Sequence, residues 1–102
     1  MISILQENRE QIAALCRRYR VRRLEVFGSA ATDRFDKEAS DVDFLVEFHT
    51  LEPGERAEAY FGLLEALQTL LGRSVDLVTV RAIQNPYFLQ AIERTRQVVY
   101  AA

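Results

Sequence analysis

The segment from Asp41 to Phe48 constrains the fold of this chain more than any other, because apolar and polar side chains alternate along it. Successive side chains of a β-strand point to opposite faces of the sheet, so residues two apart share a face. One face of the expected strand is apolar and carries Val42, Phe44, Val46 and Phe48. The other face carries Asp41, Asp43, Leu45 and Glu47. We therefore expect a well-anchored strand that begins with two carboxylates on one face.

Helical periodicity and short β-branched runs surround this strand. The predicted elements, in chain order, are a helix from about residue 3 to 19, strands at 23–27 and 41–48, a helix at 55–71, a strand at 75–80 and a helix from about 86 to 95. Residues 97–100 form either a short edge strand or a tail. This order predicts an α/β (α+β) fold, a small mixed β-sheet of three to four strands flanked by helices.

The size and charge of the chain limit the class of protein to which it can belong. With 102 residues, we expect residues 1–102 to form a single domain. Thirteen Lys and Arg residues oppose fifteen Asp and Glu residues, and the net charge of −2 does not indicate nucleic-acid binding. No apolar run approaches the roughly 18–20 residues of a membrane span, and the N-terminus lacks the apolar centre of a signal peptide. We expect a cytoplasmic protein that does not enter the membrane.

The basic residues cluster locally, with five arginines between Arg17 and Arg23. Cations stabilise the carbonyl-rich end of a helix, so this cluster is interpreted first as the solvated end of the first helix. A patch that binds phosphate or a partner protein is the alternative.

Three aspartates point to a metal site. Asp41 and Asp43 leave the same face of one strand, and two adjacent carboxylates repel each other unless a cation, water or a raised pKa relieves the repulsion. Asp76 lies near the start of another expected strand, and it would stand next to Asp43 if the two strands are neighbours. Three carboxylates together with nucleotide phosphates suit Mg²⁺, and two such ions can stabilise both oxygens of an in-line displacement.

Gly28 and Ser29 follow directly on the first expected strand. Glycine lets a backbone approach a ligand closely. The residues that follow can begin a helical turn whose N–H groups face a phosphate, and the Ser29 hydroxyl can donate to the same group. Each motif has a simpler interpretation alone, since a Gly-Ser pair is usually a turn and an Asp-x-Asp pair usually a solvated strand end. Their order along the chain favours the functional one.

Three motifs together resemble the minimal nucleotidyltransferase (MNT) family, a branch of the polymerase-β-like nucleotidyltransferase superfamily. They are Val26-Phe27-Gly28-Ser29, then the run from Ser40 to Phe48, then Val75-Asp76-Leu77-Val78. The resemblance implies that Gly28 and Ser29 hold the triphosphate of ATP. It also implies that Asp41 and Asp43 bind two Mg²⁺ ions, and that Asp76 joins the metal that activates the acceptor hydroxyl.

The same resemblance implies a partner. Members of this family are commonly antitoxins paired with a HEPN-domain toxin, and some transfer AMP from ATP to a tyrosine of that toxin. We therefore expect a Mg²⁺-dependent nucleotidyltransferase with a HEPN-type partner; homo- and hetero-oligomers are both compatible with the sequence. Many relatives carry an arginine where Thr32 stands, and Arg34 or Lys37 could replace it. The alternative is therefore an antitoxin with weak catalysis that neutralises its partner by contact.

Overall fold

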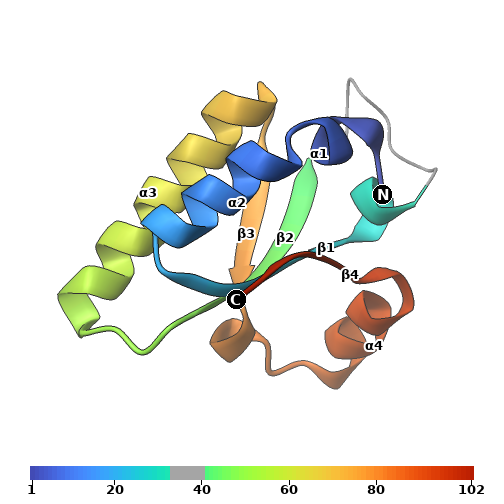
Figure 1. The fold of residues 1–102 in the computed structure, drawn as a ribbon. Coiled ribbons are helices and arrows are strands. Elements are labelled where there is room, and N and C mark those ends of the chain that lie inside the picture. Colours follow the sequence, from blue (N-terminus) through green and yellow to red (C-terminus); the bar gives the residue numbers. More distant parts are fainter. Residues whose placement is uncertain (33–40) are drawn as a thin grey trace.

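The computed structural model of the chain describes residues 1–32 and 41–102. Figure 1 shows helices packed on both sides of a twisted sheet. In chain order the elements are α1 (Ser3–Glu7), α2 (Arg9–Arg18), β1 (Val21–Phe27), the short 3₁₀ helix η1 (Gly28–Ala31), β2 (Val42–Phe48), α3 (Pro53–Leu71), β3 (Val75–Thr79), the 3₁₀ helix η2 (Val80–Ala82), α4 (Pro86–Thr95) and β4 (Gln97–Ala101).

The four strands form one mixed sheet in the order β3-β2-β1-β4. β2 and β3 are parallel, and α3 forms the crossover that a parallel pair requires. β1 pairs antiparallel with β2 on one side and with β4 on the other. The predicted mixed sheet with flanking helices is therefore confirmed. The segment left open between strand and tail is a strand beside β1.

The main core lies between one face of the sheet and helices α1, α2 and α3. Apolar side chains from all four strands meet the helices there; fully or nearly fully buried members include Leu24, Phe44, Leu77, Val99, Cys16 and Leu67. In β2 these are the even-numbered positions, as the alternation predicted. Each such side chain contributes about 1.5–3 kcal/mol relative to an exposed one, so β2 is held firmly in the middle of the sheet.

The opposite face of the sheet is covered only in part, by α4. Ile92 of α4 packs there against Phe27 of β1 and Leu45 of β2. Figure 1 places α4 on the side of the sheet opposite α2 and α3. This partly open face carries the odd-numbered side chains of β2, among them the polar residues Asp43 and Glu47.

The predicted helix over residues 3–19 is wrong in one respect, because it is two helices that meet at Asn8. The Asn8 side-chain amide donates to the Ile4 carbonyl at 2.8 Å, and the Asn8 backbone leaves the helical region with φ −106 and ψ 19. Asparagine side chains compete in this way for backbone groups. Within residues 1–32 and 41–102, no helix combines the length and apolar character needed to cross a membrane.

Candidate active site

Asp43 and Asp76 are direct register partners on the parallel strands β2 and β3. The neighbouring strands that the sequence only suggested are therefore present, and the pairing brings these two aspartates together at the start of both strands. Asp43 is half-buried and Asp76 is exposed. Asp41 is exposed one residue before β2 begins.

The electrostatics of Asp43 show that the three aspartates share one environment. The pKa of Asp43 is raised from its ordinary value of 3.8 to about 6, first by burial and then by the charges of Asp76 and Asp41. Both neighbouring carboxylates are thus near enough to change the pKa of Asp43 through their charge. A proton or a cation relieves this repulsion.

Asp41, Asp43 and Asp76 form one corner of the sheet. Their carboxylate oxygens are the kind of ligand that a hard cation such as Mg²⁺ binds, but their arrangement does not form a complete binding site. Carboxylate oxygens are the protein ligands that Mg²⁺ takes, together with water and phosphate oxygens. Among the described residues, however, no three His, Cys, Asp or Glu side chains are gathered closely enough to hold a metal ion by themselves. The corner therefore offers a pair of carboxylates with a third nearby, and it leaves several coordination positions for a bound nucleotide.

Gly28 lies directly against this corner. Phe27, the residue before it, is the register partner of Asp43 on the antiparallel strand pair. Gly28 adopts the left-handed conformation with φ +72, and a Cβ atom placed on it would lie 2.9 Å from Oδ2 of Asp43. Both the conformation and the close approach require glycine here. The structure therefore places the predicted Gly-Ser turn beside the predicted metal ligands.

The turn that carries Ser29 is short and is held from outside. It is the four-residue 3₁₀ helix η1, closed by hydrogen bonds from the Thr32 amide and hydroxyl to the Ser29 carbonyl, both at 3.2 Å. The Gly28 amide donates to Oγ1 of Thr95, the last residue of α4, at 2.8 Å. Sequence reasoning missed Thr95. Arg34 and Lys37, suggested as substitutes for an arginine at position 32, lie outside the described residues.

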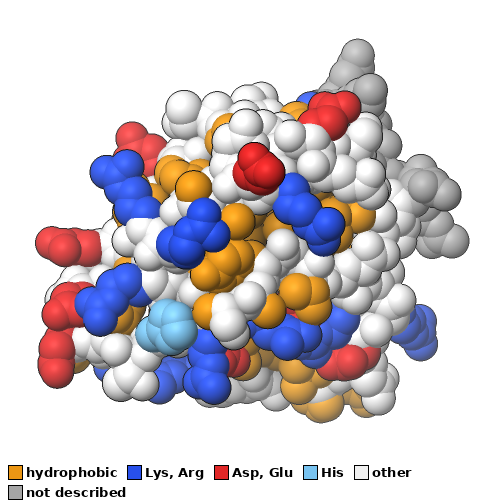
Figure 2. All heavy atoms as spheres, in the orientation of Figure 1, with side chains coloured by type: hydrophobic (Ala, Val, Ile, Leu, Met, Phe, Trp, Pro, Cys, Tyr) orange, Lys and Arg blue, Asp and Glu red, His pale blue; other side chains and the backbone are white. Residues whose placement is uncertain are grey.

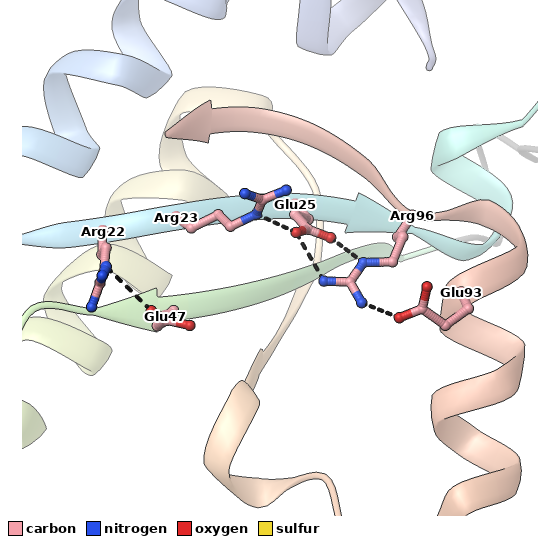
Figure 3. Close-up of polar contacts among 6 residues, drawn as sticks. All are labelled: Arg22, Arg23, Glu25, Glu47, Glu93 and Arg96. Atoms are coloured by element: carbon pink, nitrogen blue, oxygen red, sulfur yellow. Dashed lines mark hydrogen bonds and ion pairs between the residues drawn. The ribbon is translucent and has the colours of Figure 1, made fainter. Parts of the chain in front are cut away.

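A buried carboxylate, Glu25, occupies the same face of the sheet and was also missed. It is 2% exposed. Arg96 donates to both of its oxygens, from Nε at 2.5 Å and from Nη2 at 2.9 Å, and Arg23 donates from Nε at 2.5 Å. The Arg96 hydrogen bond chiefly holds the pKa of Glu25 below its ordinary value. Figure 3 shows Arg96 between Glu25 and Glu93, so this cluster joins α4 to β1.

The arginine cluster at residues 17–23 is largely engaged within the chain. Figure 2 shows Lys and Arg side chains across the middle of the face that α2 and β4 present. Arg17 and Arg18 lie in the last turn of α2, where cations stabilise the helix end. The intramolecular partners are Glu55 for Arg20 at 2.8 Å, Glu47 for Arg22 at 3.5 Å, Glu25 for Arg23, and the ring of Tyr19 for Arg18. These contacts favour the structural interpretation of the cluster.

Comparison with known proteins shows the family of this chain. The family model of the nucleotidyltransferase domain matches residues 9–99. A Methanocaldococcus jannaschii protein, named as a predicted protein adenylyltransferase, is 40% identical over 76 residues, or 74% of each chain. A solved structure described as a predicted minimal nucleotidyltransferase is 35% identical, with 91% of this chain and 90% of that chain covered and a TM-score of 0.72.

A second solved structure shares the fold at lower identity. It is a complex of a tri-AMPylated Shewanella oneidensis HEPN toxin with an MNT antitoxin. The matched chain is 23% identical, with 96% of this chain and 73% of that chain covered and a TM-score of 0.63.

These comparisons confirm the resemblance to minimal nucleotidyltransferases that the three motifs indicated. The region that the family model matches contains the Gly28-Ser29 turn and all three aspartates. The chain is therefore a nucleotidyltransferase, and it belongs to the family of the nucleotidyltransferase domain.

Proposed function

We propose that the chain transfers AMP from ATP to a hydroxyl group of a protein, with Asp41, Asp43 and Asp76 as ligands of Mg²⁺. Gly28 and Ser29 hold the triphosphate in this proposal. The observation that carries it is the register pairing of Asp43 with Asp76, combined with the position of Gly28, where a Cβ atom would lie only 2.9 Å from Oδ2 of Asp43. A carboxylate pair and a phosphate-binding turn then lie side by side, as phosphoryl chemistry needs.

The reaction is an in-line displacement at the α-phosphorus of ATP. The acceptor oxygen forms a bond to that phosphorus, the bond to the β-phosphate bridging oxygen breaks, and pyrophosphate leaves with the electron pair. Asp76, the more exposed of the two register partners, accepts the proton of the hydroxyl. Bound Mg²⁺ would supply neutralisation of the phosphate charge. Gly28 and Ser29 orient the triphosphate, and positioning of this kind accounts for much of catalysis in phosphoryl transfer.

The protein acceptor that we propose is a tyrosine of a HEPN-type toxin, so that the chain acts as an antitoxin. Two comparisons support this choice. The M. jannaschii relative is named as a predicted protein adenylyltransferase, and the S. oneidensis structure pairs an MNT antitoxin with an AMPylated HEPN toxin.

The test is transfer of label from α-³²P-ATP to a HEPN-type toxin encoded beside the gene of this chain, with and without Mg²⁺. We expect Mg²⁺-dependent labelling by the wild type and a loss of at least about a hundredfold in Asp43→Asn, because electrostatic groups at a reacting phosphate contribute on that scale. Glu58→Gln, an exposed change on α3, is the matched control. Undiminished labelling by Asp43→Asn would reject the site.

A second function, neutralisation by contact alone, is favoured by a specific observation. The three aspartates are not gathered into a complete ligand set in the described residues, and Thr32 stands where many relatives carry an arginine. Under this alternative, Asp43→Asn still protects cells from the toxin and still binds it in a pull-down, although no label is transferred. Loss of protection in that variant, with binding retained, favours the enzyme.

A further inference from the structure

The end of α4 is tied to the Gly-Ser turn by a hydrogen bond between residues 67 positions apart in the sequence. The Gly28 amide donates to Oγ1 of Thr95 at 2.8 Å. The second half of the four-residue η1 is fixed separately, because the Ala30 and Ala31 carbonyls accept hydrogen bonds from the first two residues of the chain and from Gln97. The contact with Thr95 therefore adds a restraint at the first residue of the turn.

The position of this turn leaves little tolerance for movement. An added Cβ on Gly28 would lie 2.9 Å from Oδ2 of Asp43, so the space between Gly28 and that carboxylate does not admit even a methyl group. The position of a nucleotide held by the turn and by metal ions on Asp43 would depend on the distance between the turn and Asp43. A misplacement of about 1 Å at a reacting group can cost roughly a hundredfold in rate.

Thr95 is itself held in place by the residue that follows it. The Arg96 guanidinium donates two hydrogen bonds to the Glu25 carboxylate, at 2.5 and 2.9 Å, and it also donates to Glu93. Glu25 is 2% exposed and lies on β1, the strand that leads into Gly28. Figure 3 shows this ion pair bridging the end of α4 and β1. The C-terminal end of α4 is thus fixed to the same strand that carries the turn.

We propose that Thr95 is a positioning residue of the nucleotide site, whose hydroxyl holds the Gly28-Ser29 turn against Asp43 while the Glu25–Arg96 ion pair holds Thr95. The inference rests on the proposed function in one respect, the contact of Gly28 and Ser29 with the triphosphate. The hydroxyl, and not the bulk of the side chain, is what the inference requires, because Oγ1 accepts the Gly28 N–H. Replacement by valine keeps the shape and removes the acceptor.

The experiment compares Thr95→Val with Thr95→Ser in the full chain. We expect Thr95→Val to weaken binding of a non-hydrolysable ATP analogue with Mg²⁺ by about tenfold, the value of one hydrogen bond of about 1.4 kcal/mol. The KM for ATP should rise by a similar factor, while the KM for the protein acceptor stays unchanged. Thr95→Ser, which keeps the acceptor oxygen, should have the wild-type affinity for the ATP analogue and the wild-type KM for ATP. Thr69→Val, an exposed threonine on α3, is the control for the substitution itself.

A readout without nucleotide separates this inference from the proposed function. Amide hydrogen exchange at Gly28, measured by NMR, should be at least about fivefold faster in Thr95→Val than in the wild type or in Thr95→Ser. Equal exchange, or equal nucleotide affinity in Thr95→Val and wild type, overturns the inference. If Thr95→Val does not fold, Thr95→Ala is compared with Thr95→Ser instead, because these two side chains differ only by the hydroxyl. A wild type that binds no ATP analogue, with Gly28 exchange changed as expected, rejects the proposed function alone.

Discussion

Asp43 of β2 and Asp76 of β3 lie side by side as register partners at the start of two parallel strands. The Val42, Phe44 and Val46 side chains on the other face of β2 are completely buried, so the backbone that carries Asp43 cannot move away from Asp76 without opening the core. Fixed like charges are costly, and perturbed carboxylates of this kind concentrate at functional sites. The core on one face therefore maintains the repulsion on the other.

Neutralising Asp43 should stabilise the metal-free protein. The pKa of Asp43 is raised from 3.8 to about 6, so the folded state binds more protons than the unfolded state between these pH values. Stability therefore falls as pH rises from about 4 to about 6. At pH 7 we expect Asp43→Asn to gain up to about 3 kcal/mol in unfolding free energy, since one pKa unit corresponds to about 1.4 kcal/mol. Urea unfolding at pH 4 and pH 7 measures this gain, which should shrink toward zero at pH 4.

The control for this gain is Glu58→Gln, an exposed carboxylate on α3 away from the site. Surface changes of this kind alter stability by less than about 0.5 kcal/mol. A loss of stability in Asp43→Asn at both pH values would contradict the repulsion inferred at Asp43.

Mg²⁺ should stabilise the wild type in a pH-dependent manner. A ligand that binds only the folded state raises the unfolding free energy by RT ln(1 + [L]/Kd), or about 1.4 kcal/mol at ten times Kd. The carboxylates must be ionised to bind the ion, and the pKa of Asp43 is about 6. Differential scanning fluorimetry should therefore show a larger Mg²⁺-induced rise in melting temperature at pH 7.5 than at pH 5. The same rise in Asp43→Asn would assign the effect to non-specific binding.

The parts of the site that follow local periodicity were predictable from the sequence. Alternation along β2 predicted that Asp43 lies on the face opposite the buried Val42, Phe44 and Val46, because strand geometry has a period of two whatever the rest of the chain does. Asp41 lies one residue before β2, so its place on the same face stays a prediction. The pairing of Asp43 with Asp76 was only a conditional expectation, since register depends on which strands become neighbours. It holds because α3 returns the chain to the adjacent, parallel position.

The parts that depend on distant contacts were not predictable. Thr95 meets Gly28 across 67 positions, and no local pattern marks a threonine at a helix end as the partner of a turn. Glu25 did offer a signal, because it shares the face of Phe27 on β1. A carboxylate at that position is either solvated or paired, and only the tertiary structure brings Arg96 onto it. The break at Asn8 was missed because apolar spacing continues across it.

Replacing Gly28 by alanine should damage the site more than the fold. Gly28 and Gly72 both have positive φ, +72 and +65, so alanine at either position costs about 1 kcal/mol of backbone strain. They differ in surroundings, because a Cβ on Gly28 meets Oδ2 of Asp43 at 2.9 Å and a Cβ on Gly72 meets nothing within 4 Å. Gly28→Ala therefore displaces the carboxylate. We expect similar urea midpoints for the two variants, but loss of ATP-analogue binding in calorimetry for Gly28→Ala alone.

Two glutamates on the open face of the sheet, Glu25 and Glu47, both pair with arginine. Glu25 is 2% exposed and bonded to Arg96 and Arg23, whereas the side chain of Glu47 is 42% exposed and lies 3.5 Å from Arg22. Glu25→Gln should cost about 3 kcal/mol, the low end for a broken buried pair because both arginines keep some contact with water. Glu47→Gln should cost below about 1 kcal/mol.

The stabilisation by Glu25 should depend on pH, because its pKa is lower in the folded protein than the ordinary value of 4.5. The contribution of Glu25 to the free energy of unfolding is therefore complete above about pH 4.5 and is lost as the pH falls further. Urea unfolding from pH 3 to pH 7 should therefore show that the difference in unfolding free energy between wild type and Glu25→Gln becomes smaller in acid. A difference that stays constant with pH would show that Glu25 contributes through packing and not through its charge.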